Sequence, residues 1–179
     1  MPLISTHVLH ESPIIRLQRD TVEFPDGSTG TLDIVRHPGA SAIVPMLDDL
    51  TALDPRVLLI RQFRHAVGGW IWEVPAGRLD AGGKEHPELA AARELTEETG
   101  YSAARLERLT SIVTTPGFSD EIIHLFLATG LTPGQHHREP GEFMELHEVR
   151  WSEAMRMVRS GGIVDSKTLV GLMIVDGRR

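Results

Sequence analysis

Short apolar segments separated by turn residues dominate this sequence, and they constrain the fold more than any other feature. The runs 42–47 and 57–63 are rich in Ile, Val and Leu, which is typical of buried strands. Pro25-Asp26-Gly27 lies between two further segments of this kind and predicts the turn of a hairpin. The whole pattern predicts strands at 16–24, 31–36, 42–47, 57–63, 71–74, 109–114, 122–128 and 146–151.

Helix-end signals and helical spacing predict three helices among these strands. Pro87 suits the first turn of a helix, and Gly100 suits the left-handed residue that ends one. Ser152 is a candidate N-cap, because its hydroxyl oxygen can accept a hydrogen bond from a backbone N–H of the first turn. The predicted helices lie between Lys84 and Gly100, from Ser152 to the residue before Gly161, and from about Ser166 to Val175.

Composition and charge exclude several classes of protein. With 179 residues, 41% of them hydrophobic and 24% charged, the chain fits one globular domain and is not disordered as a whole. Its 18 Lys and Arg residues face 25 Asp and Glu residues, which gives a formal net charge of −7 without any basic tract. Binding to nucleic acids or to an anionic membrane is therefore not expected.

The residue types that are missing also narrow the chemistry. The chain has no cysteine, which excludes disulfides, thiolate nucleophiles and cysteine-bound zinc. No apolar run approaches the roughly 18 residues that cross a bilayer, and the first residues carry no targeting signal. We expect a cytoplasmic protein whose chemistry depends on oxygen and nitrogen groups.

A dense group of acidic residues ends the first predicted helix, in the octet 93–100. Glu94 and Glu98 are four residues apart on one helix face, with Glu97 beside them. Like charges at this spacing repel one another, and the negative end of the helix dipole adds to the repulsion. A hard divalent cation such as Mg²⁺ or Mn²⁺ would offset both effects by accepting carboxylate oxygens. The alternative is a solvated acidic helix face, which the octet by itself does not exclude.

The residues around this octet resemble the Nudix box. Its pattern is Gly, five residues, Glu, seven residues, and then Arg-Glu-aliphatic-x-Glu-Glu-x-Gly-aliphatic. Glu85 and the residues 86–100 match this pattern in register. Two positions depart from it, because seven residues separate Gly77 from Glu85, and Tyr101 replaces the final aliphatic residue. The pair Gly82-Gly83 absorbs the two additional residues as a longer loop.

The resemblance implies an α/β sandwich of mixed sheets between helices, to which this chain adds an N-terminal strand pair. We expect an N-terminal strand extension over residues 1–36 and a Nudix hydrolase domain over residues 37–179. The family resemblance also implies an enzyme that hydrolyses a nucleoside diphosphate linked to another group. Its cofactor would be Mg²⁺, for which Mn²⁺ can substitute.

A second resemblance concerns the substrate. The segments 61–65 and 115–121 resemble the ADP-ribose pyrophosphatase subgroup, and Pro116 stands fifteen residues after Tyr101, as the proline that marks this subgroup does. The subgroup implies cleavage of ADP-ribose to AMP and ribose 5-phosphate by a homodimer that exchanges its N-terminal strands. The alternatives are hydrolysis of a GDP or UDP sugar, and a non-catalytic module that senses a nucleotide sugar.

Pyrophosphate cleavage assigns roles to the acidic residues. The phosphate oxygens repel an attacking hydroxide, so catalysis needs cations that bridge these oxygens and lower the pKa of a bound water. We expect Glu94 and Glu98 to be metal ligands, and Glu97 to share a metal or to hold a metal-bound water. Arg93 would orient one of these carboxylates, and the resemblance adds the backbone carbonyl of Ala76 as a ligand.

The general base is expected on the loop before the last strand, where the resemblance places a glutamate. We choose Glu142, because Gly141 beside it would let the loop close over a substrate, and we take Glu145 as the second candidate. A solvated loop is the alternative interpretation of this glutamate-rich segment.

Four further residues are candidates for substrate binding. Arg64 suits a forked contact with the phosphates, and Glu121 suits a hydroxyl group of the terminal ribose. Arg36 is an additional candidate. Phe118 and Trp70 suit stacking on adenine, although aromatic side chains serve more often in packing.

Overall fold

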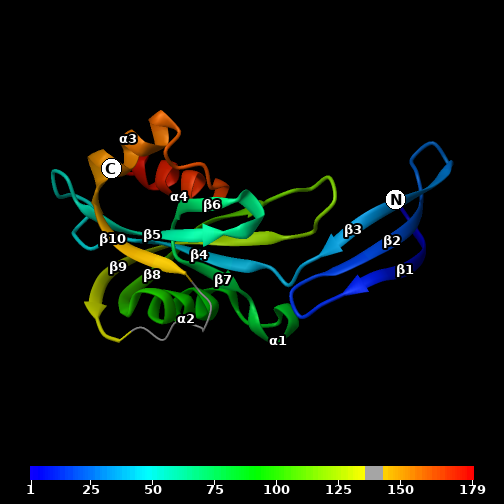
Figure 1. Ribbon diagram of the computed structural model, residues 1–179, viewed down its shortest axis with the longest axis horizontal. Helices are drawn as coiled ribbons and strands as arrows, with labels where there is room; N and C mark the ends of the chain where they lie inside the picture. The colour runs from blue at the N-terminus through cyan, green and yellow to red at the C-terminus, as the bar shows by residue number, and fades with distance from the viewer. Residues whose placement is uncertain (136–142) are drawn as a thin grey trace.

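The computed structural model describes residues 1–135 and 143–179 and is shown in Figure 1. Within these residues the strands are β1 Leu3–Glu11, β2 Arg16–Glu23, β3 Thr29–Arg36, β4 Ala40–Pro45, β5 Arg56–Arg64, β6 Gly69–Glu73, β7 Ala76–Arg78, β8 Tyr101–Val113, β9 Ile122–Pro133 and β10 Met144–Arg150. The helices are η1 His65–Val67, α1 Asp80–Gly83, α2 Pro87–Thr99, α3 Trp151–Ser160 and α4 Ser166–Asp176.

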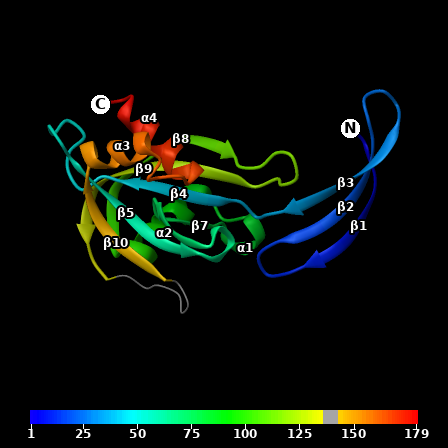
Figure 2. The ribbon, with the colours of Figure 1, turned by 45° about the horizontal axis from the view of Figure 1, so that its top comes forward.

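Two sheets form the body of the molecule. One has the strand order β7-β4-β9-β8 and the other the order β10-β5-β6. The first sheet is mixed, because β4 and β9 run parallel while its other neighbouring strands run antiparallel. In Figures 1 and 2, α3 and α4 lie on one side of these strands and α2 lies on the other. The predicted α/β sandwich of mixed sheets between helices is confirmed.

The N-terminal residues form a separate sheet, β1-β2-β3, which extends away from the body in Figure 2. The hairpin predicted around Pro25-Asp26-Gly27 is confirmed, since β2 and β3 pair antiparallel on its two sides. The predicted strand pair is incomplete, however, because β1 pairs with the free edge of β2 as a third strand. All nine residues of β1 are exposed, so its sequence lacks the alternation that a half-buried strand would show.

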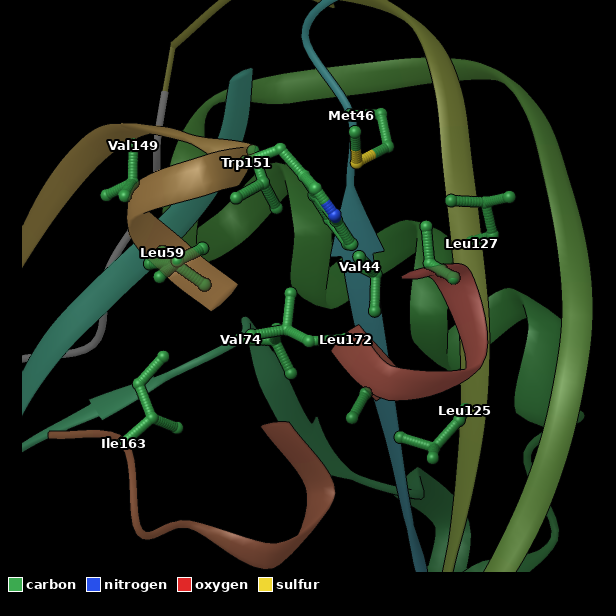
Figure 3. Packing of buried hydrophobic residues seen from close by; sticks show 14 of the residues in the cluster. Val44, Met46, Leu59, Val74, Leu125, Leu127, Val149, Trp151, Ile163 and Leu172 are labelled. Atoms are coloured by element: carbon green, nitrogen blue, oxygen red, sulfur yellow. The ribbon is translucent and has the colours of Figure 1, made fainter. Parts of the chain in front are cut away.

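Successive residues of β4 hold the layers together from opposite faces. Val44 packs in the main core with Leu125, Trp151 and Leu172, as Figure 3 shows. Its neighbour Ile43 faces the other way and belongs to the cluster that includes two residues of α2, Ala91 and Leu95, and two of β9, Phe126 and Ala128. A buried strand therefore joins α2 on one face to α3 and α4 on the other, as the period-two geometry of strands requires.

The helix predictions are confirmed in place but not in every detail. Pro87 is the first residue of α2, and Gly100 follows its last residue with a φ of 78°. The proposal that Ser152 caps the second helix is wrong, because α3 begins at Trp151 and its N-cap is Arg150. The backbone N–H and hydroxyl of Ser152 both donate instead to the carboxylate of Asp54. None of the described helices is long and apolar enough to cross a membrane.

Candidate active site

The last two turns of α2 present their carboxylates to a cavity of about 590 Å³. Ala91 and Leu95 bury one face of the helix against the sheet, which turns Glu94 and Glu98 toward β7. Glu98 is 4% exposed although it is charged, and its Oε2 accepts a hydrogen bond from the backbone N–H of Ala76 at 3.0 Å. The structure thus brings Glu94, Glu97, Glu98 and Ala76 to the lining of one cavity.

Arg93 binds the carboxylates that surround it. Its Nη1 lies 2.7 Å from Oε1 of Glu94 and 2.9 Å from Oε2 of Glu97. Its Nε and Nη2 contact the two oxygens of Glu85 at 3.2 and 2.9 Å, and Nη2 also donates to the carbonyl oxygen of Arg78. The hydrogen bonds with Glu85, above all, keep the pKa of Arg93 above its usual range. The arginine thereby offsets part of the repulsion that the sequence predicts.

Gly77 lets the backbone of β7 approach the carboxylate of Glu94 directly. A Cβ atom at this position would lie 1.9 Å from both the carboxyl carbon and Oε1 of Glu94. No side chain fits at that distance, so this residue must be glycine if Glu94 keeps its position. The glycine that opens the Nudix pattern therefore has a steric explanation in this chain.

The two additional residues between Gly77 and Glu85 are accommodated around α1. Gly82 and Gly83 both have positive φ angles, of 66° and 86°. Glu85 remains in contact with the site through Arg93, and its Oε2 accepts a hydrogen bond from the backbone N–H of Asp80 at 2.9 Å. The hydrogen bonds from Arg93 lower the pKa of Glu85 despite partial burial.

Sequence reasoning missed a buried ion cluster that holds Arg64. Glu73 is 1% exposed and accepts two hydrogen bonds from Arg64, at 2.6 Å from Nε and 2.8 Å from Nη2. Lys167, at the start of α4, donates to the same carboxylate at 2.5 Å and contacts Asp165 at 3.0 Å. Burial alone would raise the pKa of Glu73, but the hydrogen bonds from Arg64 and the charge of Lys167 lower it. No local pattern reveals this cluster, because residues 73 and 167 are distant in sequence.

The cluster fixes the orientation of Arg64 in the cavity. Two of its guanidinium nitrogens are bound by Glu73, so the charged group has one orientation and one Nη group left for a ligand. Arg64, Glu73 and Lys167 all line the cavity that Glu94 and Glu98 line. The carboxylates of α2 and the guanidinium of Arg64 on β5 therefore face the same cavity.

The other candidates for substrate binding divide into two groups. Glu121 lines the cavity and accepts a hydrogen bond from the hydroxyl of Thr114 at 2.8 Å. Arg36 does not line it, because its guanidinium is bound by Asp20 at 2.8 Å and Asp120 at 3.2 Å. Through these contacts Arg36 links the N-terminal sheet to the loop before β9, which is a structural role.

Both aromatic candidates are exposed and lie outside the cavity lining. Phe118 is 54% exposed on the loop beside β3, where its carbonyl oxygen accepts a hydrogen bond from the N–H of Val35. Trp70 is 43% exposed and makes an edge-to-face contact with Phe63 at 5.8 Å. Within this chain neither ring reaches the carboxylates of α2.

Of the two candidates for the general base, only Glu145 is among the described residues. Glu142 lies outside the described residues. Glu145 lies on β10 opposite Arg61, and its Oε2 is 3.9 Å from Nη1 of that arginine and 3.3 Å from Nε2 of His147. It is not part of the cavity lining.

The donor set at the end of α2 fits a hard divalent cation. All its groups are oxygens, and Gly77 lets the β7 backbone lie directly against them. Among the described residues, no three acidic or histidine side chains are gathered closely enough to form a complete metal cage. Mg²⁺ does not require one, because it commonly takes one or two carboxylates, several waters and the phosphates of the substrate. Glu94, Glu98 and the carbonyl of Ala76 would hold it here.

These features define a class of protein: an α/β sandwich in which the helix on one side of the sheets (Figure 1) presents the carboxylates of a Nudix-type acidic sequence to a cavity that Arg64 also lines. The chain belongs to the Nudix family. The family model described as "NUDIX domain" matches residues 36–167, and the model described as "Nucleoside diphosphate sugar hydrolase N-terminal domain" matches residues 2–31.

Individual relatives cover nearly the whole chain. It is 42% identical to the "ADP-ribose pyrophosphatase" of Mycobacterium tuberculosis, over 96% of this chain and 81% of the relative. It is 39% identical to the "ADP-ribose pyrophosphatase" of Bacillus subtilis, over 92% of this chain and 86% of the relative. A solved structure, "Crystal structure of ADP compounds hydrolase", shares the fold at a TM-score of 0.81 and 21% identity, covering 99% of this chain and 92% of the other.

Proposed function

We propose that this protein hydrolyses the pyrophosphate of ADP-ribose to AMP and ribose 5-phosphate with Mg²⁺ as its cofactor. One observation carries the proposal: the acidic end of α2 and the immobilised Arg64 line the same cavity. A diphosphate needs this combination, because its oxygens require cations while its reacting phosphorus must be held in place. The names of the two relatives above support ADP-ribose as the substrate.

The residues of the chain supply binding and orientation. Arg64 contacts phosphate oxygens through its remaining Nη group, while Glu73 and Lys167 prevent the guanidinium from turning away. Glu121 accepts a hydrogen bond from a ribose hydroxyl. Arg93 holds Glu94 and Glu97 in the orientation that faces the phosphates. When bound, Mg²⁺ neutralises phosphate charge and lowers the pKa of a water molecule.

The proton of the attacking water passes to a glutamate in this proposal. Glu142 remains the first choice, and its place on the chain just before β10 supports it. Glu97 also lines the cavity and is 42% exposed at its side chain, so it can hold or orient a water there. The exposed position of Glu145 on β10 is less favourable to its role.

A homodimer is part of the proposal, and the surface of β1 supports it. Leu3, Ile4, Val8 and Leu9 are all more than 40% exposed on an edge strand of the N-terminal sheet. An unprotected apolar edge of this kind favours pairing with a second chain. We retain residues 1–36 as the exchanging extension and residues 37–179 as the hydrolase domain.

A cysteine-free chain suits the cytoplasm, which we propose as its location.

A substrate panel tests the reaction. Purified protein with Mg²⁺ is incubated with ADP-ribose, a GDP sugar and a UDP sugar, and the products are separated by chromatography. The proposal predicts AMP and ribose 5-phosphate from ADP-ribose at the highest kcat/KM of the panel. A higher kcat/KM for another nucleotide sugar would assign that substrate instead, and tight binding without any cleavage would indicate a sensing module.

A further inference from the structure

Gln62 has a buried polar atom whose hydrogen-bonding capacity is unmet in the described part of the chain. The residue is 6% exposed, and its Oε1 is closed to solvent and has no hydrogen-bond partner among residues 1–135 and 143–179. Buried amide oxygens in native proteins nearly always accept a hydrogen bond, and an unmet one lowers stability. The position therefore requires an explanation beyond packing.

The side chains paired with Gln62 across the sheet cannot supply a hydrogen-bond donor for its Oε1, whereas the cavity beside it is open to a ligand. The residue lies on β5, the central strand of its sheet, between Met144 of β10 and Ile71 of β6. Neither flanking side chain can donate a hydrogen bond. Gln62 also lines the cavity that Arg64 and Glu98 line. Because no described residue donates to Oε1, a group that enters this cavity can supply the donor.

We propose that Gln62 is a substrate-binding residue whose amide oxygen accepts a hydrogen bond from a ribose hydroxyl of the nucleotide sugar. The assignment rests on the function proposed above. Ionised phosphate oxygens only accept hydrogen bonds, so Oε1 cannot serve the diphosphate itself. Arg64 lies two residues further along the same face of β5, a distance of about 7 Å in a strand. The groups attached directly to a diphosphate held at Arg64 are the two riboses, and their hydroxyls are donors.

Oε1 is closed to solvent in the free protein, so we expect the terminal amide of Gln62 to turn toward the ligand when substrate enters. In the free protein this oxygen therefore adds no hydrogen bond that would stabilise the fold. Replacing a structural glutamine removes a hydrogen bond from the free protein and lowers its stability. Replacing a glutamine that bonds only to the ligand does not, and the two roles can be distinguished in this way.

Gln62→Met tests this distinction, since methionine keeps the length of the side chain and has no amide. We expect the KM for ADP-ribose to rise about tenfold, as the loss of one hydrogen bond to a buried polar group predicts. The melting temperature should stay equal to that of the unmodified protein or rise. Gln18→Met is the matched control for stability, because Gln18 is also buried, at 4% exposure, but donates to Asp20 at 2.7 Å. It should lower the melting temperature.

Arg61→Met is the control for binding, because Arg61 lies next to Gln62 in sequence, is exposed and does not line the cavity. It should leave the KM unchanged.

A second substrate separates the ribose from the base. For inosine diphosphate ribose, whose base lacks the amino group of adenine, Gln62→Met should raise the KM by the same factor as for ADP-ribose. An unchanged KM of Gln62→Met for inosine diphosphate ribose would overturn the assignment of Gln62 to ribose.

Product inhibition identifies which ribose is bound. AMP and ribose 5-phosphate are compared as inhibitors, and Gln62→Met should weaken one of them about tenfold. An unchanged KM together with unchanged inhibition by both products would overturn the inference while leaving the proposed function intact. If the unmodified protein does not cleave ADP-ribose, the proposed function fails, and calorimetric titration with the two products still decides the role of Gln62. A lowered melting temperature with an unchanged KM would make Gln62 a structural residue.

Discussion

At the scale of single residues, the site depends on close approach between backbone and carboxylate. Gly77 brings β7 so near Glu94 that a methyl group can be added there only if the carboxylate moves. Arg93 then binds Glu94 and Glu97 through one nitrogen, which limits how far either carboxylate can turn. The acidic patch is therefore an ordered arrangement of charges and not only a solvated helix face.

We predict that Gly77→Ala lowers kcat/KM about 100-fold, the loss that a displacement of about 1 Å at a reacting group produces. The new Cβ must push the carboxylate of Glu94 aside. Steady-state kinetics measure the effect. Gly69→Ala is the matched control, because a Cβ there meets no atom within 4 Å. Equal activity of the two variants would show that Glu94 does not need its position.

Glu73 gives the protein a pH-dependent contribution to stability. Its pKa is lowered in the folded state from the ordinary value of 4.5, so the charged carboxylate stabilises the fold above that pH. The contribution disappears as the pH falls through the lowered pKa.

Glu73→Gln should therefore lower the free energy of unfolding at pH 7 by about 3 kcal/mol, because it leaves Lys167 buried without its main partner. The difference from the unmodified protein should shrink below pH 4.5. Urea unfolding at several pH values measures it. A constant difference down to pH 3 would contradict the assignment.

At the scale of elements, α2 was predictable and the contacts around it were not. Pro87, Gly100 and the octet 93–100 predict its ends and its chemistry from local sequence alone, because helix caps and like-charge spacing are local properties. The pairing of Arg64 and Lys167 with Glu73 joins β5, β6 and α4, so it depends on tertiary structure. The exposed strand β1 was missed for a related reason: no buried face imposes a pattern on its sequence.

The position of α2 should depend on its buried side chains. Leu95 is fully buried between the helix and the sheet, whereas Leu89 in the same helix is 64% exposed. We expect Leu95→Ala to cost about 3 kcal/mol of stability and to lower kcat, because the carboxylates lose their support. Leu89→Ala should cost less than about 0.5 kcal/mol. Thermal unfolding and kinetics on both variants provide the measurement, and a similar cost for both would disprove this view of the helix.

At the scale of the whole molecule, the N-terminal sheet is tied to the body at few points. Val35 bridges to Ser119, and Arg36 bonds to Asp120. The sheet otherwise extends outward with an exposed apolar edge, which an isolated chain would leave in water. In the proposed homodimer, a second copy of the chain covers this edge.

In the proposed homodimer this edge lies at the subunit interface, so Val8→Lys should shift the protein from dimer to monomer by burying a charge there. Val8 is 44% exposed in the single chain. Leu53→Lys is the control, since Leu53 is fully exposed on a loop of the body. Sedimentation velocity distinguishes the two states. A monomeric unmodified protein would disprove the exchange of N-terminal strands.

The proposed reaction requires that carboxylates at the end of α2 act on a diphosphate through a divalent cation. Its most direct test is the release of AMP from ADP-ribose with Mg²⁺ by Glu98→Gln, compared with Glu88→Gln in the exposed first turn of the same helix. We predict that Glu98→Gln lowers kcat at least 100-fold, whereas Glu88→Gln retains full activity. Unchanged turnover by Glu98→Gln would show that the carboxylates of α2 do not take part in the reaction.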